Sequence, residues 1–330
     1  SSIGLIVTNG EPGVRGTSQT VGADFNYRNS ARADGSVLEG NLFAIATRND
    51  PTGAPAEDDY AFGGRIDWSN DPWGFMVFAA QVGHDFDPAL GFVSRPGERE
   101  YQASADYRIR PNGGTDFIRS VDLITRLAMY TDLSGEVNSL QLFVPTISIL
   151  SAQGDFARFH MELTQENLDE PFEIDDGNVI PVGRYDWWEA STNMGTSASR
   201  PVSGNVFYAY GEFYSGRRTD WGGGLSWQPN ASFTTGATFT QNEIRLPTGD
   251  FDVQIVSANM DVQFTPEIRW STILQWDNRS DSAGLNSRLR WEFEPGQDVF
   301  IVYNDNYDTE NDWAATDTAV VVKVGLTLRF

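Results

Sequence analysis

One histidine with two neighbouring carboxylates is the group of residues whose types could support catalysis. His84 precedes Asp85 and Asp87, and a histidine beside paired carboxylates could activate water for hydrolysis. A plain loop is the favoured interpretation, because the sequence shows no serine–histidine–acid order and no phosphate-binding glycine loop. We therefore predict that the chain is not an enzyme, and we keep a hydrolase near His84 as the catalytic alternative.

Two further groups offer ligand chemistry. His160 lies between Arg158 and Glu162 at a spacing of two, which favours a hydrogen-bond network on one strand face. The acidic segments 170–176 and 305–312 could bind Ca²⁺ through carboxylates and carbonyls, although neither has the spacing of a defined calcium loop. Solvated acidic loops are the alternative, and no other cofactor is expected. The weak metal candidates are Asp305, Asp308 and Asp312.

Tyrosines at even positions between residues 208 and 214 could recognise sugars. Tyr208, Tyr210 and Tyr214 alternate with more apolar neighbours, and this phase predicts that they point to the polar face of their strand. Aromatic rings in a pore can stack on sugar faces. Packing against loops folded onto that face is the competing interpretation.

The elements that must position these residues are strands. The chain contains about eighteen strand-like segments, most of them longer than the five or six residues usual in soluble sheets. Tilted strands that cross a bilayer need about 9–11 residues, so strand length favours a membrane barrel. We predict one all-β domain over residues 1–330, a transmembrane antiparallel β-barrel of eighteen strands, with sixteen as the alternative.

Composition agrees with a barrel. Hydrophobic residues make up 40% of the chain, whereas aromatic residues reach 13%. The chain has no cysteine, which excludes thiol catalysis and disulfide scaffolds, and its formal charge of −23 argues against nucleic acid as a partner. The sequence begins without a signal peptide, so we expect that an export signal has been removed.

Connectors are predicted to alternate in length. Even-numbered connectors are mostly short and often contain Pro or Gly, whereas odd-numbered connectors are longer, more acidic and more irregular. Short periplasmic turns and long extracellular loops are typical of outer-membrane barrels. The connectors predicted to be long include 47–59, 84–98, 165–184 and 305–316.

Period-two alternation predicts two contrasting strand faces. In the last strand, residues 319–330, valine, leucine and phenylalanine alternate with Lys323, Gly325 and Arg329, and the strand ends on Phe330. Charged residues on the polar face can be satisfied only by water or by each other, which is typical of a water-filled channel or a plugged lumen. The predicted lumen-facing charges are Arg65, Asp67, Asp106, Arg108, Arg126, Arg158, Glu162, Arg269, Arg288, Arg290 and Lys323.

Aromatic residues gather near the short turns, in phase with the apolar face. This placement predicts an aromatic girdle at the boundary between lipid and headgroups. A row of core aromatics is the alternative. The girdle residues are Trp68, Trp73, Tyr107, Trp227, Trp291 and Phe330.

Several segments, in the same order over essentially the whole chain, resemble one family. They are 85–95, 168–174, 179–183, 246–251, 288–296 and 299–305, the fifth reading R-L-R-W-E-F-E-P-G. They look like the C-terminal barrel of the family called domain of unknown function 5916, in which a carbohydrate-binding family-9-like domain usually precedes the barrel. The resemblance implies an outer-membrane location and supplies no catalytic residues, and the sugar-binding-like domain is not among these residues.

We therefore expect a bacterial outer-membrane barrel that acts as a porin-like channel or uptake protein for small solutes or saccharides. The first alternative is an interaction barrel with a blocked lumen that anchors a periplasmic or surface protein. The expected partners are outer-membrane lipid, lipopolysaccharide and the barrel-assembly machinery, which would read the C-terminal strand ending in Phe330.

Overall fold

The computed structural model describes residues 1–11, 16–51, 53, 55–111, 117–310 and 312–327. These residues form one eighteen-stranded antiparallel sheet and a separate two-stranded hairpin, which confirms the all-β prediction and the larger of the two strand counts. Among the described residues no helix is long and apolar enough to cross a membrane.

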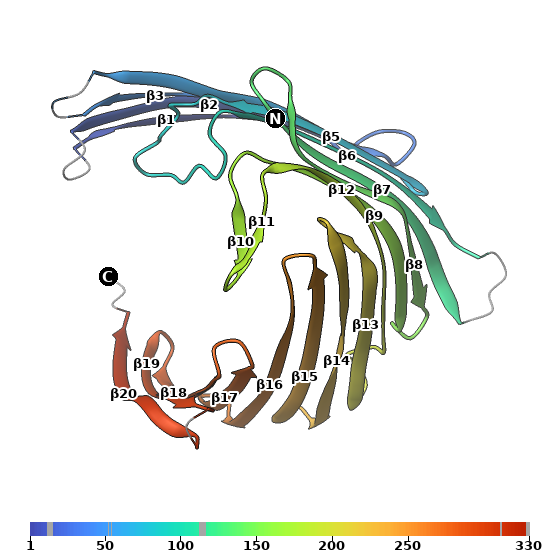
Figure 1. The fold of residues 1–330 in the computed structure, drawn as a ribbon, viewed down its shortest axis with the longest axis vertical. Helices are drawn as coiled ribbons and strands as arrows, with labels where there is room; N and C mark the ends of the chain where they lie inside the picture. Colours follow the sequence, from blue (N-terminus) through green and yellow to red (C-terminus); the bar gives the residue numbers. More distant parts are fainter. Residues whose placement is uncertain (12–15, 52, 54, 112–116, 311, 328–330) are drawn as a thin grey trace. The chain divides into compact units, whose positions relative to one another are not determined.

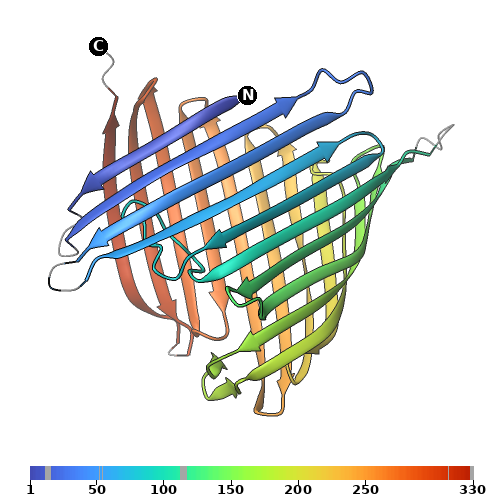
Figure 2. The same cartoon turned by 90° about the horizontal axis from the view of Figure 1, so that it is seen from above.

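The strands follow each other along the sheet as long meanders (Figure 2). The first nine are β1 (Ser2–Gly10), β2 (Thr17–Asn29), β3 (Val37–Asp50), β4 (Glu57–Ser69), β5 (Trp73–Val82), β6 (Glu98–Ile109), β7 (Ile118–Asp132), β8 (Val137–Ser151) and β9 (Phe156–Leu168). The hairpin is β10 (Phe172–Asp175) and β11 (Asn178–Ile180). The other nine are β12 (Gly183–Gly195), β13 (Val202–Phe213), β14 (Gly216–Asn230), β15 (Phe233–Leu246), β16 (Gly249–Thr265), β17 (Ile268–Asp277), β18 (Ser282–Glu294), β19 (Gln297–Asp308) and β20 (Ala314–Leu326).

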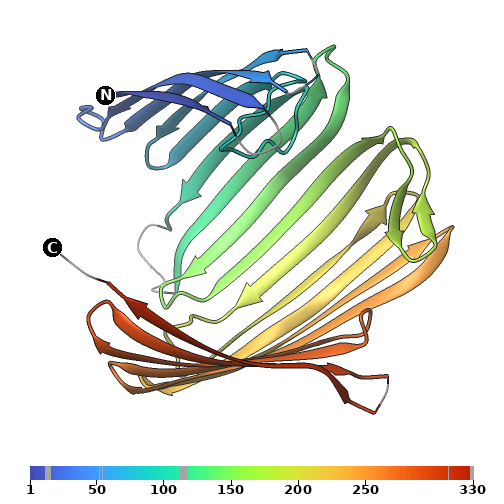
Figure 3. The ribbon, with the colours of Figure 1, turned by 90° about the vertical axis from the view of Figure 1, so that its left-hand side faces the viewer.

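The chain divides into two compact units. Unit 1 contains Ser1–Gly113, Ser120–Ser148 and His160–Trp188, and unit 2 contains Gly114–Arg119, Ile149–Phe159 and Glu189–Phe330. In unit 1 the strands from β1 to β7 pair in chain order, and in unit 2 those from β12 to β20 do the same (Figures 1 and 3).

Unbroken registers keep each side chain on one face. The β2–β3 ladder runs from Thr17 opposite Asp50 to Asn29 opposite Leu38 without a bulge, and the β15–β16 ladder in unit 2 is equally regular. Because the side-chain period is two, a regular ladder preserves the polar and apolar faces across neighbouring strands. Four register shifts in unit 2 lie close to strand ends: those of β14, β16 and β18 are next to tight turns, and the fourth is near the end of β19.

The described residues bury few large apolar side chains. The buried hydrophobic residues include Phe86, Ile180 and Trp187, whereas many large side chains on one strand face are exposed, such as Ile66 at 60% and Val77 at 60% in unit 1. Val206 and Leu225 in unit 2 are each 62% exposed. Monomeric soluble proteins rarely expose contiguous apolar patches larger than a few hundred Å². The described residues therefore leave large apolar side chains uncovered on one sheet face in each unit.

The predicted alternation of connectors holds only in part. The connectors 83–97 and 169–182 are long, as predicted. The other two connectors predicted to be long are shorter, because the flanking strands extend into them: β3 and β4 leave only 51–56, and β19 and β20 leave only 309–313. The odd-numbered connectors 214–215 and 247–248 are tight turns, so the expectation that all odd-numbered connectors are longer is wrong. Strand pairing extends into sequences with turn-like composition because each added residue pair gains ladder hydrogen bonds. The predicted turn at 111–114 lies partly outside the described residues.

Hydrogen bonds to an aspartate side chain stabilise the connector 30–36. Asp34 accepts hydrogen bonds from the amide of Ser36 at 3.0 Å and from its hydroxyl at 2.7 Å. These two donors hold the pKa of the Asp34 carboxyl below its usual value. This turn therefore favours an ionised Asp34.

Candidate functional site

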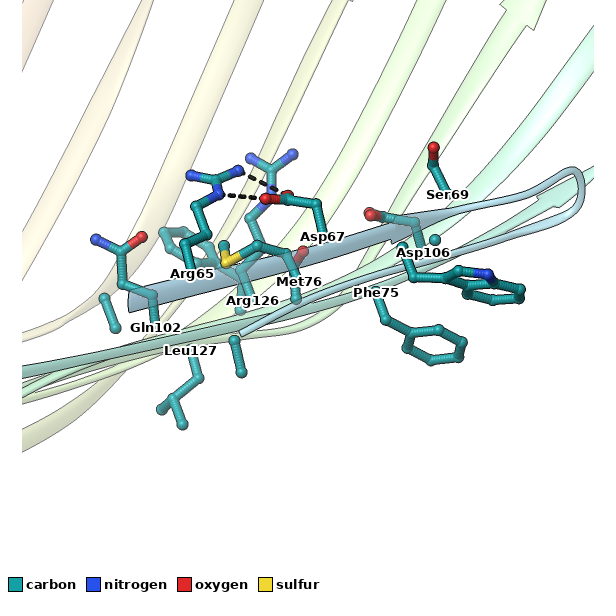
Figure 4. A pocket seen from close by; sticks show the side chains of 15 residues that line it. Arg65, Asp67, Ser69, Phe75, Met76, Gln102, Asp106, Arg126 and Leu127 are labelled. Atoms are coloured by element: carbon teal, nitrogen blue, oxygen red, sulfur yellow. Dashed lines mark hydrogen bonds and ion pairs between the residues drawn. The ribbon is translucent and has the colours of Figure 1, made fainter. Parts of the chain in front are cut away.

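A pocket of about 480 Å³ lies over the β4–β7 strands of unit 1 (Figure 4). Arg65, Asp67, Gln102, Asp106 and Arg126 point to one side of the sheet, whereas Phe75 and Leu127 point to the other. The registers explain this arrangement, since Asp67 lies opposite Met76 and Ser104 lies opposite Arg126. The structure thus brings four of the predicted polar-face charges into one pocket.

The charges in and around this pocket are largely compensated within the sheet. Arg65 donates to both carboxylate oxygens of Asp67, at 2.6 and 2.8 Å. Arg108 is paired with Asp122, which lies directly opposite it on β7. Charges held in pairs on one strand face provide a polar surface that a dissolved ion or a water molecule can contact. The pocket has the chemistry of a lining for polar solutes.

Connector 83–97 folds back onto the same face of unit 1. Its neck closes where the Gly97 amide donates to the Gly83 carbonyl at 3.0 Å. Phe86 is only 7% exposed and, with Phe92, lines a cavity of about 280 Å³ against apolar residues of β3, β4 and β5. Sequence reasoning missed the anchoring role of Phe86, because an apolar residue within an acidic loop gives no periodicity signal.

The histidine of this connector is placed beside the neck. A side chain at Gly97, which has a φ of +76°, would collide with the His84 imidazole. The Asp85 amide donates to Asp59 Oδ2 at 2.8 Å, and the Asp87 carbonyl accepts from Asn49 at 2.9 Å. These contacts give Asp85 and Asp87 a role in fastening the loop to β3 and β4.

The second long connector contains the β10–β11 hairpin, which projects from the strands of unit 1 (Figure 1). Phe172 pairs with Ile180 and Glu173 pairs with Val179. Ile180 is one of the most deeply buried side chains in the described part of the chain. The Tyr185 hydroxyl, at the start of β12, donates to the Pro181 carbonyl at 2.9 Å. The connector is therefore an ordered element fixed at its base.

Unit 2 carries a mixed polar face. Amide side chains line a pocket of about 380 Å³ on β17, β18 and β19, and basic residues follow on the same strands. Four predicted charges lie together there, namely Arg269, Arg288, Arg290 and Lys323. Arg158 and Glu162 lie elsewhere, on β9, where they alternate with the exposed residues Phe159 and Met161.

An ion-pair cluster on β12 and β14 was not anticipated from sequence. Arg218 contacts Glu189 at 2.9 Å and Asp220 at 3.0 Å. Glu189 and Arg218 reach each other across Gly211, the residue that lies between them on β13 and has no side chain. A glycine that lies between two charged residues on neighbouring strands is the sequence signal for such a cluster. The three residues are known to be neighbours only once the strand register is known.

The predicted position of the tyrosines is wrong. Tyr208 lies opposite Trp221, and Tyr210 lies on the same face, which also carries Val206 and Leu225, whereas Ala209 lies opposite Asp220 on the polar face. Tyr214 follows the end of β13 with a φ of +49° and does not continue the alternation. Aromatic residues occur on both faces of such a strand, so their type does not show which face they occupy. Only the pairing of β13 with β14 determines it. A stacking track for sugars on the polar face is therefore not formed by these tyrosines.

The acidic metal candidates do not converge. Asp305 lies opposite Leu285 and is 5% exposed, whereas Asp308 lies opposite Ser282 on the other face. Residues three apart in a strand point to opposite faces, which separates these two carboxylates. Asp305 instead accepts hydrogen bonds from Tyr303, Tyr307 and Thr318. Within the described ranges, no three acidic or histidine side chains form a group that could hold a metal ion.

Aromatic residues on the apolar face gather in contact clusters near the short turns. In unit 1, the Trp73 ring lies 4.4 Å from that of Tyr107, and the Trp68 ring stacks on Phe75 at 5.6 Å. In unit 2, Trp227 contacts Phe233 and Trp291 contacts Phe293. The predicted girdle residue Phe330 lies outside the described residues.

Comparisons with known proteins give a likeness in structure but none in sequence. No family model matches the chain. No curated protein matches it either. Among solved structures, the chain is similar to the siderophore receptor PirA from Acinetobacter baumannii, with 10% sequence identity and a TM-score of 0.40 over 96% of this chain and 72% of that chain. A similarity this low does not indicate what the chain binds.

Proposed function

We propose that the chain is a bacterial outer-membrane β-barrel whose polar face lines an aqueous path for small solutes. The observation that carries this proposal is the two-faced eighteen-stranded sheet, with exposed large apolar side chains on one face and charged side chains on the other. Water can solvate the second face but not the first, and lipid can cover the first but not the second.

Strand dimensions support the membrane part of the proposal. β4 has 13 residues and β5 has 10, and both keep their alternation throughout. A tilted strand of about 9–11 residues is long enough to cross the hydrocarbon layer. Hydrocarbon offers no partner for an unpaired backbone, so a sheet in lipid must close on itself. Closure into a barrel is therefore part of the proposal.

The girdle, the location and the partners belong to the same proposal. Trp73, Tyr107 and Trp227 supply amphipathic rings near short turns, where a headgroup layer would meet the strands. Outer-membrane lipid and lipopolysaccharide would contact the apolar face. We also propose that the assembly machinery reads the last strand and that the chain is a member of the domain of unknown function 5916 family.

A second candidate function is an interaction barrel with a blocked lumen. The observation that favours it is connector 83–97, which Phe86 anchors on the polar face of unit 1. A loop held on the face that would line the path reduces the space for solutes. In this case the barrel would chiefly hold a periplasmic or surface partner.

Single-channel conductance of the purified, folded protein in a planar bilayer tests both candidates. The matched variant replaces residues 85–96 by a short glycine–serine turn, which the Gly83–Gly97 neck makes feasible. We expect stable conductance steps for the wild type and larger steps for the variant, because the loop occupies part of the polar face. Folded protein without conductance in either form would contradict a solute path, and conductance only in the variant would favour the interaction barrel.

A further inference from the structure

Four basic side chains gather on the polar face of β17–β20 in unit 2. Arg269 lies directly opposite Arg290, and Lys323 lies opposite Phe300. The guanidinium groups of Arg288 and Arg290 both lie over the Phe300 ring, at 5.7 and 5.8 Å from its centroid. Like charges directly opposite each other destabilise a sheet, so this arrangement has a cost that needs an explanation.

The neighbouring carboxylates compensate only part of this charge. Asp261 lies 2.7 Å from Arg269, and Arg290 contacts Glu292 at 2.9 Å and Asp298 at 3.3 Å. Within the part of the chain that the structure describes, Arg288 and Lys323 have no ion-pair partner, and both side chains are exposed. Lys323 is also the single lysine of a chain with a net charge of −23. The surplus of positive charge is therefore local and opposite in sign to the rest of the molecule.

The amide-lined pocket lies next to these basic residues on the same strands. Its lining includes Gln275 on β17, Asn286 on β18, and Asn304 and Asn306 on β19. Asn286 precedes Arg288 by two residues on the same face, a separation of roughly 7 Å along a strand. Side-chain amides offer donors and acceptors at once, which matches hydroxyl groups.

We propose that this part of the polar face binds a small solute that has an oxyanion joined to a hydroxyl-rich body, such as a sugar acid or a sugar phosphate. Arg288, Arg290 and Lys323 would hold the oxyanion, and the amides of β18 and β19 would hold the hydroxyl groups. The proposal rests on the proposed function for access to the site, and it adds the class of substrate.

The geometry explains why arginine suits this position. A guanidinium group can donate two parallel hydrogen bonds to a carboxylate or phosphate, and such charge-assisted bonds are stronger than neutral ones. The Phe300 ring fixes both guanidinium groups before a ligand arrives, which reduces the entropy lost on binding. Glu292 and Asp298 orient Arg290 without occupying Arg288.

Isothermal titration calorimetry of the folded protein in detergent micelles tests the site separately from conductance. The probes are glucuronate, glucose 6-phosphate, glucose and inorganic phosphate. We expect both anionic sugars to bind, and glucose and inorganic phosphate each to bind about tenfold more weakly or worse, because each lacks one half of the recognised chemistry. A preference for glucuronate or for glucose 6-phosphate would identify carboxylate or phosphate as the favoured oxyanion.

The variants R288Q and K323Q, and their double variant, examine the assigned residues. We expect each single variant to weaken binding of the anionic sugars about tenfold, and R48Q to leave it unchanged. Arg48 is a matched control because it is paired with Asp50 in unit 1. Unchanged affinity in the double variant, or an equal loss in R48Q, would overturn the assignment, as would equal binding of glucose. Binding without conductance would support the site and contradict the solute path, whereas conductance without binding would overturn the site alone.

Discussion

Asp305 shows, at the scale of a single residue, how a carboxylate is accommodated on an apolar sheet face. Leu285 lies opposite it, yet the carboxylate is almost completely covered. Tyr303 donates to it at 2.7 Å and Thr318 donates at 2.7 Å, and the Tyr307 hydroxyl is a third donor. These three donors compensate the carboxylate for the hydrogen bonds to water that it loses by being covered.

Replacing Asp305 by alanine is expected to lower the urea midpoint of unfolding. The substitution leaves the Tyr303, Tyr307 and Thr318 hydroxyl groups without their common acceptor. Tryptophan fluorescence during urea titration measures the midpoint. D317A is the control, because Asp317 lies on the same unit's polar face opposite Asn306 and is exposed. An equal midpoint for D305A and wild type would show that the three donors do not depend on the carboxylate.

Residue positions could be predicted from sequence where polar and apolar types alternate strictly. Arg65 and Asp67 alternate with Ile66 and Trp68, so their face follows from period two alone. Tyr208 could not be placed in this way, because both faces of β13 carry aromatic residues and only the pairing with Trp221 decides. The Arg218 cluster could not be predicted either, because it depends on Gly211 lying between Glu189 and Arg218, which only the strand register shows.

At the scale of elements, the regular ladders depend on small residues where strands crowd. A side chain at Gly222 on β14 would lie 2.2 Å from the Phe239 carbonyl oxygen and 2.8 Å from the Phe207 ring. Neither the backbone oxygen nor the ring can move away without disturbing its ladder. The strands were readily predicted from sequence, but this crowding follows only from their register.

G222A is therefore expected to destabilise the fold by about 1–3 kcal/mol, the usual cost of overpacking. The free energy of unfolding in urea measures the effect. G40A on β3 is the matched control, because a side chain there would have its nearest neighbours at 3.8 and 3.9 Å. Equal stability of the two variants would contradict the crowding at β14.

The way in which connector 83–97 docks on the strands could not be predicted from sequence. Its length was predicted, but its docking depends on Phe86 fitting among apolar residues from three strands.

We expect F86A to raise the rate at which chymotrypsin cleaves after the exposed Phe92, since a buried phenylalanine contributes about 3–5 kcal/mol to stability. Mass spectrometry of the fragments measures the rate. L90A is the control, because Leu90 is exposed, and an unchanged rate in F86A would show that another contact holds the loop.

At the scale of the whole molecule, strand number and antiparallel order could be predicted because both follow from alternation and turn signals. The amide pocket and the basic residues beside it could not be predicted as a site, since they combine side chains from β17 to β20 that are far apart in sequence. In the proposed arrangement, lipid covers one face of this sheet and water covers the other.

Single-cysteine fluorescence labelling can distinguish the lipid-covered face from the water-covered face, because the chain has no cysteine of its own. The variants are neighbours on opposite faces, V77C with M76C in unit 1 and L225C with S226C in unit 2. After reconstitution, we predict that nitroxide lipids quench the label at residues 77 and 225, and that aqueous iodide quenches it at residues 76 and 226. Equal quenching within each pair, or no lipid quenching at any of the four positions, would contradict a sheet that spans the membrane.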